Sequence, residues 1–449
     1  MSQLQMEHTA IDALKPFERN ARTHSPKQIQ QIARSIEQFG FNNPVLVDAN
    51  SCIIAGHGRV EAAKLLGIDS VPTICLDHLT DAEKRAYIIA DNRLAELAGW
   101  DKDILAIELQ HLTAMDLDFN IELTGFDLAE IEIAIDPPEE DLVEPAIPEL
   151  PDDDALVTGV GDLWVLGDHR VYCGDARNVQ TYTALLGNEK VRVQFADPPY
   201  NVPIDGHVSG LGEVEHDDFA MACGEMSEAE FTAFLITVLS LGAKHSVDGA
   251  LHYICMDWRH LLELLNAGHS VFDEYLNLCV WNKTNGGMGS LYRSKHELVL
   301  VFKHGNASHI NNVQLGKYGR YRTNVWDYAG MSSMGADRLD NLEMHPTVKP
   351  VALVADVLRD ASHRGDLVLD AFGGAGSTLL AAELTGRRAR LIEIDPRYVD
   401  VTIQRWQQET GGTAVLLDTG QTFEEVAEAR LAGIEVPAAS DVPEVSHVE

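Results

Sequence analysis

The sequence predicts an α/β protein in which a doubly wound, mostly parallel sheet follows a smaller α+β domain. Strand and helix patterns alternate from about residue 156 onward, and an acidic, proline-rich stretch separates them from the first third of the chain. The length of 449 residues, 45% of them hydrophobic, is enough for more than one core. We therefore expect a first domain at 1–135, a linker at 136–155, a second domain at 156–415 and an acidic tail at 416–449.

The composition excludes several classes of protein. A formal net charge of -36 argues against a protein that coats nucleic acid nonspecifically, because affinity for phosphate chains comes mainly from Lys and Arg. No run approaches the roughly 18 to 20 apolar residues of a membrane helix, and residues 1–12 lack the features of a signal peptide. Six scattered cysteines without a C-x-x-C pair indicate reduced thiols. We expect a cytoplasmic protein with no membrane partner.

The first domain has a recognisable order of elements. Apolar strands at 43–47 and 52–55 precede a glycine turn, Gly56-His57-Gly58, and a helix that continues to about residue 67. Backbone N–H groups at such a helix start can seat an anion, with Arg59 as its counter-charge.

The linker is defined by its charge. Residues 136–154 contain nine carboxylates, five prolines and no basic residue. Such a segment repels itself, so we expect it to be extended.

The second domain shows the pattern of a parallel sheet covered on both faces. Two helical patterns, at 227–243 and 377–385, fall among its strands. The expected strands are 162–166, 191–195, 250–255, 275–281, 298–303, 367–369 and 388–394.

The first chemistry-bearing motif is Asp197-Pro198-Pro199-Tyr200-Asn201, directly after an apolar strand. Two prolines cannot continue a strand ladder, so the chain leaves the sheet at the strand's carboxyl end, where open α/β sheets bind ligands. The Asp197 carboxylate and a backbone carbonyl fixed by the turn suit the two N–H donors of an exocyclic amine. Tyr200 offers a flat face on which an extruded base can stack.

The second motif is a glycine loop between a strand and a helix. The strand at 367–369 runs into Asp370, and the next strand ends at Glu393, 19 residues after Gly374, where a carboxylate can accept both hydroxyls of a ribose. NAD is the rival ligand, but the loop departs from G-x-G-x-x-G, and Asp370 would repel a pyrophosphate while suiting an ammonium. A ligand with an amino-acid end and a nucleoside end fits, as in S-adenosylmethionine. The loop glycines are Gly373, Gly374 and Gly376.

Together these segments resemble the amino-methylating DNA methyltransferases of the permuted β group, whose D-P-P-Y motif precedes an F-x-G-x-G loop. Cys173-Gly174-Asp175-Ala176 resembles the G-D element of that group, and the segment from His345 to Pro350 resembles its H-P-T-x-K-P segment. The resemblance covers about residues 156–410. It implies catalytic roles for Asp197, Pro198, Pro199 and Tyr200. It implies cofactor contacts for Asp175, Lys349, Asp370, Phe372, Gly373, Gly374, Gly376, Ser377, Thr378 and Glu393.

The resemblance also implies a Rossmann-like fold, S-adenosylmethionine as cofactor and a reaction without metal or covalent enzyme intermediate. The enzyme would flip the target base out of the duplex. D-P-P-Y is most frequent in adenine-N6 enzymes and S-P-P-Y in cytosine-N4 enzymes, which favours adenine. The alternatives are a cytosine-N4 enzyme, an RNA or protein-glutamine methyltransferase, and a noncatalytic DNA-binding regulator.

Residues from about 11 to 101 resemble the ParB-like and sulfiredoxin-like nuclease superfamily. Gly58 stands where ParB proteins have an arginine, and the turn has no cysteine, so both nucleotide binding and sulfiredoxin chemistry lose support. Asp91-Asn92-Arg93 is expected on a helix near the same turn. We interpret this domain as an accessory DNA-binding or regulatory module.

One segment opposes the acidic character of the chain. Between Trp281 and Arg322 there are seven basic residues and a single acid, Glu297. We expect this basic island to bind double-stranded DNA, with Trp281 and Trp326 as candidates for base stacking, and a homodimer as a further assembly. His57 and His345 receive no catalytic role. The expected DNA contacts are Lys283, Arg293, Lys295, Lys317, Arg320 and Arg322.

Overall fold

The computed structural model describes residues 5–115, 118–135, 144–152, 155–202, 224–284, 291–313, 322–329 and 348–432. The chain divides into two compact units, Met1–Pro137 and Pro138–Glu449. In these described ranges, no helix is long and apolar enough to cross a membrane.

The first unit has a four-stranded sheet with the order β1-β4-β2-β3. The predicted succession of strand, strand, glycine turn and helix is confirmed: Gly56, with φ 102°, is the N-cap of α2. Helix α1 packs on α2, and the core between sheet and helices includes Val45, Val60 and Val71. The elements are β1 Met6–Ala10, α1 Pro26–Phe39, β2 Val45–Val47, β3 Ile53–Ala55, α2 His57–Leu65, β4 Ser70–Cys75, α3 Asp81–Leu97, α4 Lys102–Ala114 and α5 Leu128–Ile135.

Three helices complete this unit. A capping box between Thr80 and Glu83 begins α3, and the Asp101 side chain accepts from the backbone N–H of Ile104 at the start of α4. Helices α4 and α5 pack on each other, and the rings of Trp100 and Phe126 meet edge to face at 5.5 Å.

The second unit is built on a ten-stranded sheet with the order β11-β9-β10-β8-β7-β12-β13-β6-β5-β14. Its central strands β8, β7, β12, β13 and β6 are parallel, while β10, β9, β5 and β14 add antiparallel pairings on the two sides. The strands are β5 Leu163–Leu166, β6 His169–Cys173, β7 Val191–Ala196, β8 Ser246–Met256, β9 Glu274–Asn282, β10 His296–Lys303, β11 Val325–Asp327, β12 Leu367–Asp370, β13 Arg388–Glu393 and β14 Val415–Leu416. The helices are α6 Val179–Leu186, α7 Glu228–Lys244, α8 Leu261–Val271, α10 Val351–Ala361, α11 Ser377–Thr385, α12 Pro396–Thr410 and α13 Phe423–Leu431.

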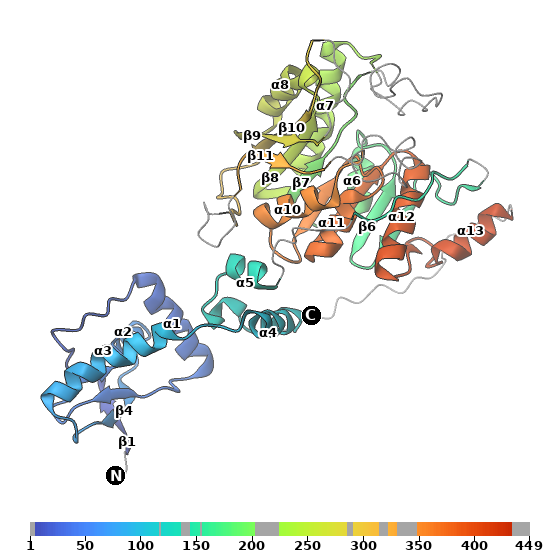
Figure 1. Cartoon of the computed structure of the whole chain (residues 1–449). Coiled ribbons are helices and arrows are strands. Elements are labelled where there is room, and N and C mark those ends of the chain that lie inside the picture. The colour runs from blue at the N-terminus through green and yellow to red at the C-terminus, as the bar shows by residue number, and fades with distance from the viewer. Residues whose placement is uncertain are drawn as a thin grey trace. The chain divides into compact units, whose positions relative to one another are not determined.

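Helices cover both faces of this sheet, as predicted (Figure 1). Strand β10 shows the alternation clearly: Leu298 and Leu300 belong to the core formed with α6, α7 and α8, whereas Val299 and Val301 belong to the core formed with α10, α11 and α12. All seven predicted strands and both predicted helices are present. The sequence patterns missed three strands of this sheet: β6, which pairs with β13, β11, which pairs with β9, and β14, which pairs with β5.

The end of the acidic linker is packed against the second unit. Residues 144–150, called the strap below, carry Ile147, which is buried at 5% exposure against Ala375 and Val401. Arg405 donates to the Pro145 carbonyl at 3.5 Å. We expected the linker to be extended and did not expect it to be packed. The strap is packed, because apolar residues between its prolines belong to a hydrophobic core.

The expected tail at 416–449 begins as folded chain. Helix α13 starts with a capping box between Thr422 and Glu425, and it buries Phe423 and Val426. The Phe423 ring lies edge to face with Trp164 at 5.4 Å. This corrects the predicted boundary, since the apolar face of α13 belongs to the core; residues 433–449 lie outside the described ranges.

Candidate active site

The carboxyl ends of four adjacent parallel strands bring the predicted carboxylates to one edge of the sheet. Asp197 follows β7, Asp370 ends β12, Glu393 ends β13 and Asp175 follows β6. The order β7-β12-β13-β6 makes each of these strands a neighbour of the next. Parallel sheets bind ligands at this edge.

Hydrogen bonds of the Tyr200 and Asn201 side chains hold the D-P-P-Y turn. The Tyr200 hydroxyl donates to Asp197 Oδ1 at 2.5 Å. Asn201 has φ 53°, and its buried side chain accepts from the backbone N–H of Gly224 and Met226 at 3.1 and 3.2 Å. These bonds fix the left-handed backbone immediately after Tyr200. The sequence analysis gave Asn201 no role, although it is part of the quoted motif.

Lys349, just before α10, contacts this turn. Its ammonium donates to Asp197 Oδ2, lies 3.3 Å from the Tyr200 hydroxyl and pairs with Glu297 Oε2 at 3.0 Å. The Lys349 side chain is only 6% exposed. The sequence resemblance implies a cofactor contact for Lys349, and the structure adds contacts with the catalytic motif.

Glu297 was missed by the sequence analysis, which counted it only as the lone acid of the basic island. It lies near the start of β10, its side chain is 12% exposed, and its other oxygen accepts from Lys283. The Lys283 ammonium lies 4.5 Å from the Trp281 ring centroid. Two lysines and two carboxylates therefore form one alternating, partly buried cluster.

The charges in this cluster control one another. Burial raises the pKa of Asp197, and the Lys349 ammonium offsets part of that rise. Burial alone would also raise the pKa of Glu297, but Lys349 and Lys283 lower it to about 2. Burial opposes protonation of Lys349, yet Asp197 and Glu297 raise its pKa above the ordinary value.

The glycine loop lies beside this cluster. Asp370 accepts from the Thr378 hydroxyl at 2.6 Å and from the backbone N–H of Phe372 at 3.0 Å. Gly374, with φ 47°, donates its N–H to Glu393 at 2.7 Å. A Cβ at Gly374 would meet nothing within 4 Å, so a ligand has room to approach the backbone there.

The loop fits a ligand with an ammonium and two hydroxyl groups. Burial raises the pKa of Asp370 to about 8 and that of Glu393 to about 7. Among the described residues, neither carboxylate forms an ion pair with a lysine or arginine, and the buried Ser377 hydroxyl has no hydrogen-bond partner. These are the groups that a cationic, hydroxyl-bearing ligand would satisfy.

Asp175 and Phe372 border the same region. Arg177 pairs with the Asp175 carboxylate at 2.7 Å, and its hydrogen bonds lower the pKa of Asp175 although burial acts in the opposite direction. The Phe372 ring is partly buried and lies 6.1 Å from that of Phe234. Gly376, with φ 81°, is the N-cap of α11.

Two members of the basic island, Arg322 and Lys303, are paired with carboxylates from outside it. Arg322 pairs with Asp356 at 2.7 Å and with Asp360 at 3.0 Å, and its side chain is 17% exposed. Lys303, another member of the island, is buried beside Glu274. The structure therefore corrects the expectation that Arg322 is an open phosphate contact, because its charge is already used within the fold.

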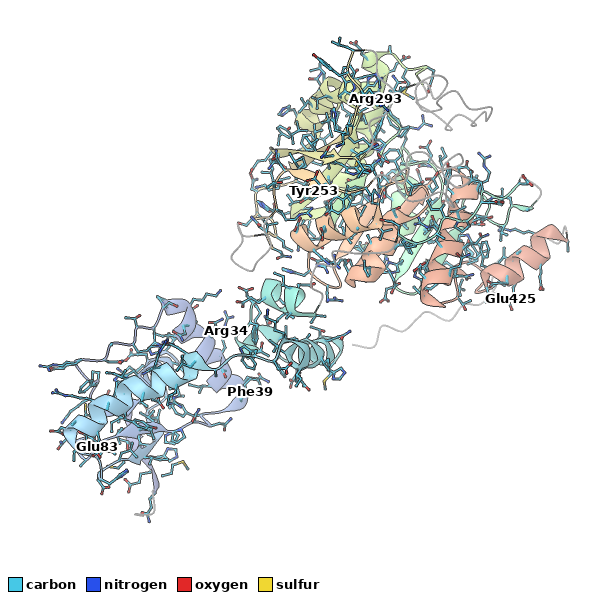
Figure 2. The ribbon with its side chains drawn as sticks, in the orientation of Figure 1. Arg34, Phe39, Glu83, Tyr253, Arg293 and Glu425 are labelled. Atoms are coloured by element: carbon cyan, nitrogen blue, oxygen red, sulfur yellow. The ribbon has the colours of Figure 1, made fainter. Side chains whose placement is uncertain are left out.

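The other predicted DNA contacts differ in exposure. Lys283 is bound to Glu297, whereas Arg293 and Lys295 are exposed on the connection between β9 and β10, where Figure 2 labels Arg293. Trp281 and Trp326 are 3% and 7% exposed, so both belong to the core and not to a stacking surface. The predicted contacts Lys317 and Arg320 lie outside the described residues, as does His345.

The polar side chains at the glycine turn of the first unit hydrogen bond within the protein. Arg59 donates to the Asn43 carbonyl at 3.1 Å, and His57 Nε2 accepts from the Phe17 N–H at 3.3 Å. A Cβ at Gly58 would meet the His24 ring at 3.1 Å. A cavity of about 380 Å³ lies between the segment 17–22 and α3, and Asn92 and Arg93 line it. The lining contains no residue of the glycine turn, so this cavity is not the pocket shared with that turn that the sequence suggested.

Comparison with known proteins assigns a family to each part of the chain. Residues 191–404 match the family described as DNA methylase, 1–93 match the ParB N-terminal domain, and 103–158 match the ParB-methyltransferase HTH domain. The ParB-like nuclease domain-containing protein YnaK of Escherichia coli K12 is 51% identical over 82 residues, which are 18% of this chain and 94% of that protein.

Two methyltransferases resemble the larger unit. The type II methyltransferase M.HinfI of Haemophilus influenzae is 24% identical over 243 residues, and the match covers 50% of this chain and 65% of that enzyme. The structure of TTHA0409, a putative DNA modification methylase from Thermus thermophilus complexed with S-adenosyl-L-methionine, has 22% identity and a TM-score of 0.38 over 54% of this chain and 94% of that one. The chain thus joins a domain that matches the DNA methylase family, at residues 191–404, to a ParB-like amino-terminal domain.

Proposed function

We propose that this chain transfers a methyl group from S-adenosylmethionine to the exocyclic amine of a flipped base in double-stranded DNA, and that the base is adenine. The observation that carries the proposal is the placement of Asp197, directly after β7, beside Asp370 at the end of the adjacent β12. An acceptor for an amine thus lies next to an acceptor for the ammonium of the methyl donor.

The chain's own residues supply binding and orientation. When bound, S-adenosylmethionine supplies a methyl group activated by its sulfonium. Asp370 holds the ammonium, Glu393 holds the ribose hydroxyls, and Gly374 lets the ligand approach the loop. Asp197 and the Pro198 carbonyl draw the two amine hydrogens into hydrogen bonds and so direct the nitrogen lone pair toward the methyl carbon.

The choice of adenine rests on the first residue of the D-P-P-Y motif. An aspartate at position 197 supports adenine N6, whereas cytosine-N4 enzymes more often carry serine at the equivalent place.

The test is to express the chain in cells without DNA methylation, hydrolyse their DNA to nucleosides and measure methylated bases by mass spectrometry. We expect N6-methyladenine from the wild type and none from Asp197→Asn. N4-methylcytosine would refute the choice of adenine. Methylated RNA with unmethylated DNA would refute DNA as the substrate.

A second function belongs to the first unit, where the cavity of about 380 Å³ is rich in arginine. Arg22 and Arg93 both contact Glu96, whereas Arg19 and Arg85 line the cavity from its two sides and are exposed. Arginine side chains at a concave surface favour phosphate groups. We expect the full chain to bind a nucleoside triphosphate or duplex DNA there, and Arg85→Ala to weaken that binding while Lys64→Ala, a change on α2, does not. Equal affinities of both variants would exclude the cavity as the site.

A further inference from the structure

Asp197 already has a hydrogen-bond donor on each of its oxygens. The Tyr200 hydroxyl occupies Oδ1 and the Lys349 ammonium occupies Oδ2. A target amine that hydrogen bonds to this carboxylate must share an oxygen with one of these donors or replace it. The donor that is replaced needs another acceptor, because a nearly buried ammonium or hydroxyl without a partner is unfavourable.

Glu297 is the acceptor within reach of both donors. Its Oε2 lies 3.0 Å from the Lys349 ammonium and 3.3 Å from the Tyr200 hydroxyl. Lys283 binds the opposite oxygen, Oε1, and so holds the carboxylate in place on β10. The Lys349 ammonium also lies 5.6 Å from the Tyr200 ring centroid, so both donors lie close together beside Glu297.

We propose that Glu297 is a positioning residue for methyl transfer. When the target amine binds to Asp197, Glu297 accepts the hydrogen bonds that Lys349 and Tyr200 donated to Asp197. This inference rests on the proposed function of Asp197. Before the base enters, Lys349 keeps the Asp197 carboxylate ionised and oriented. After the base enters, Glu297 holds Lys349, and the freed oxygen of Asp197 accepts an amine hydrogen.

The low pKa of Glu297 agrees with this role, since the group stays ionised throughout the range in which the enzyme can work. If the carboxylate were absent, Asp197 would be the sole anion left to Lys349 within the cluster. The lysine would then hold Asp197 more tightly, and the amine would compete poorly for it. Binding of cofactor, at Asp370 and Glu393, would not change.

The test compares Glu297→Gln with Glu274→Gln. Glu274 pairs with Lys303 at the other end of the same β9–β10 hairpin, so the control also removes a lysine partner from this hairpin. Single-turnover methyl transfer should fall at least tenfold in Glu297→Gln and remain within twofold of wild type in the control. Dissociation constants for S-adenosylmethionine and DNA should stay within twofold, and Glu297→Asp should recover part of the rate.

The outcomes separate this inference from the proposed function. A wild-type rate in Glu297→Gln would overturn the inference alone. A loss accompanied by equal weakening of cofactor binding, or by a lowered melting temperature not seen in the control, would show a structural role and would also overturn it. If the wild type itself transfers no methyl group to DNA, the proposed function fails and the inference falls with it.

Discussion

Cofactor binding should release protons from the enzyme. Asp370 and Glu393 are buried at the glycine loop, with pKa values of about 8 and about 7. At pH 7, an acid with a pKa of 8 is about nine-tenths protonated and one with a pKa of 7 is about half protonated. Both become fully ionised when an ammonium and two hydroxyl groups bind to them, so binding should release about 1.4 protons at pH 7.

Calorimetry in two buffers with different ionisation enthalpies measures this number directly. The release should decline as pH rises above 7, because a growing share of both carboxylates is already ionised in the free protein. Asp370→Asn should remove about 0.9 of the protons released at pH 7. If that variant binds too weakly to measure, the pH profile of the wild type decides. No release at pH 7, or a release that does not change between pH 6 and pH 9, would refute the assignment of these carboxylates.

Three further outcomes follow from the described contacts. Arg322→Ala should destabilise the methylase unit by about 3 kcal/mol in chemical denaturation, because Asp356 and Asp360 each lose a cationic partner, whereas replacing the exposed Arg293 by Ala should change stability less; equal effects would contradict the assignment of Arg322 to the fold. Ile147→Ala should cost about 2 kcal/mol and weaken cofactor binding, which equilibrium unfolding and calorimetry would check. Without cofactor, the melting temperature should fall as pH rises from 7 to 8.5, because Asp370 and Glu393, whose pKa values are raised to about 8 and about 7, lose protons from the folded state in that range; a melting temperature that rises would be contrary to this reasoning.

Local patterns were sufficient to predict the sheet and the ligand-binding edge. Val191–Ala196 is a continuous apolar run that ends at two prolines, and Leu367–Asp370 ends at a glycine loop. The two prolines and the glycine loop each lie within a few residues of the strand whose end they mark. The parallel order then brings Asp197 and Asp370 together without further information, because strand ends on one edge are neighbours.

Long-range pairing was not predictable from these patterns. The basic island was counted along the sequence, but Asp356 and Asp360, which neutralise Arg322, lie on α10 more than thirty residues away. Glu297 likewise looks like an isolated acid until β10 places it next to Lys349. Charge that is compensated in three dimensions cannot be recognised from the composition of one segment.

The tail was misjudged for a different reason. Residues 416–431 were grouped with the acidic end of the chain because their average composition is similar. The apolar residues of α13 are few, but they occupy one face and reach Trp164. The helical spacing of the apolar residues over the nine residues of α13 predicts a buried face, whereas the average charge of the segment does not.

The strap changes where the methylase can be separated from the ParB-like domain. A fragment that starts at residue 156, where the acidic composition ends, would lack Ile147 and would leave an apolar hollow beside Ala375, in the middle of the glycine loop. Val348, the neighbour of Lys349, packs against the same cluster. The strap therefore supplies a buried side chain that packs beside both the glycine loop and the segment that carries Lys349. A methylase fragment made without the ParB-like domain should retain the strap.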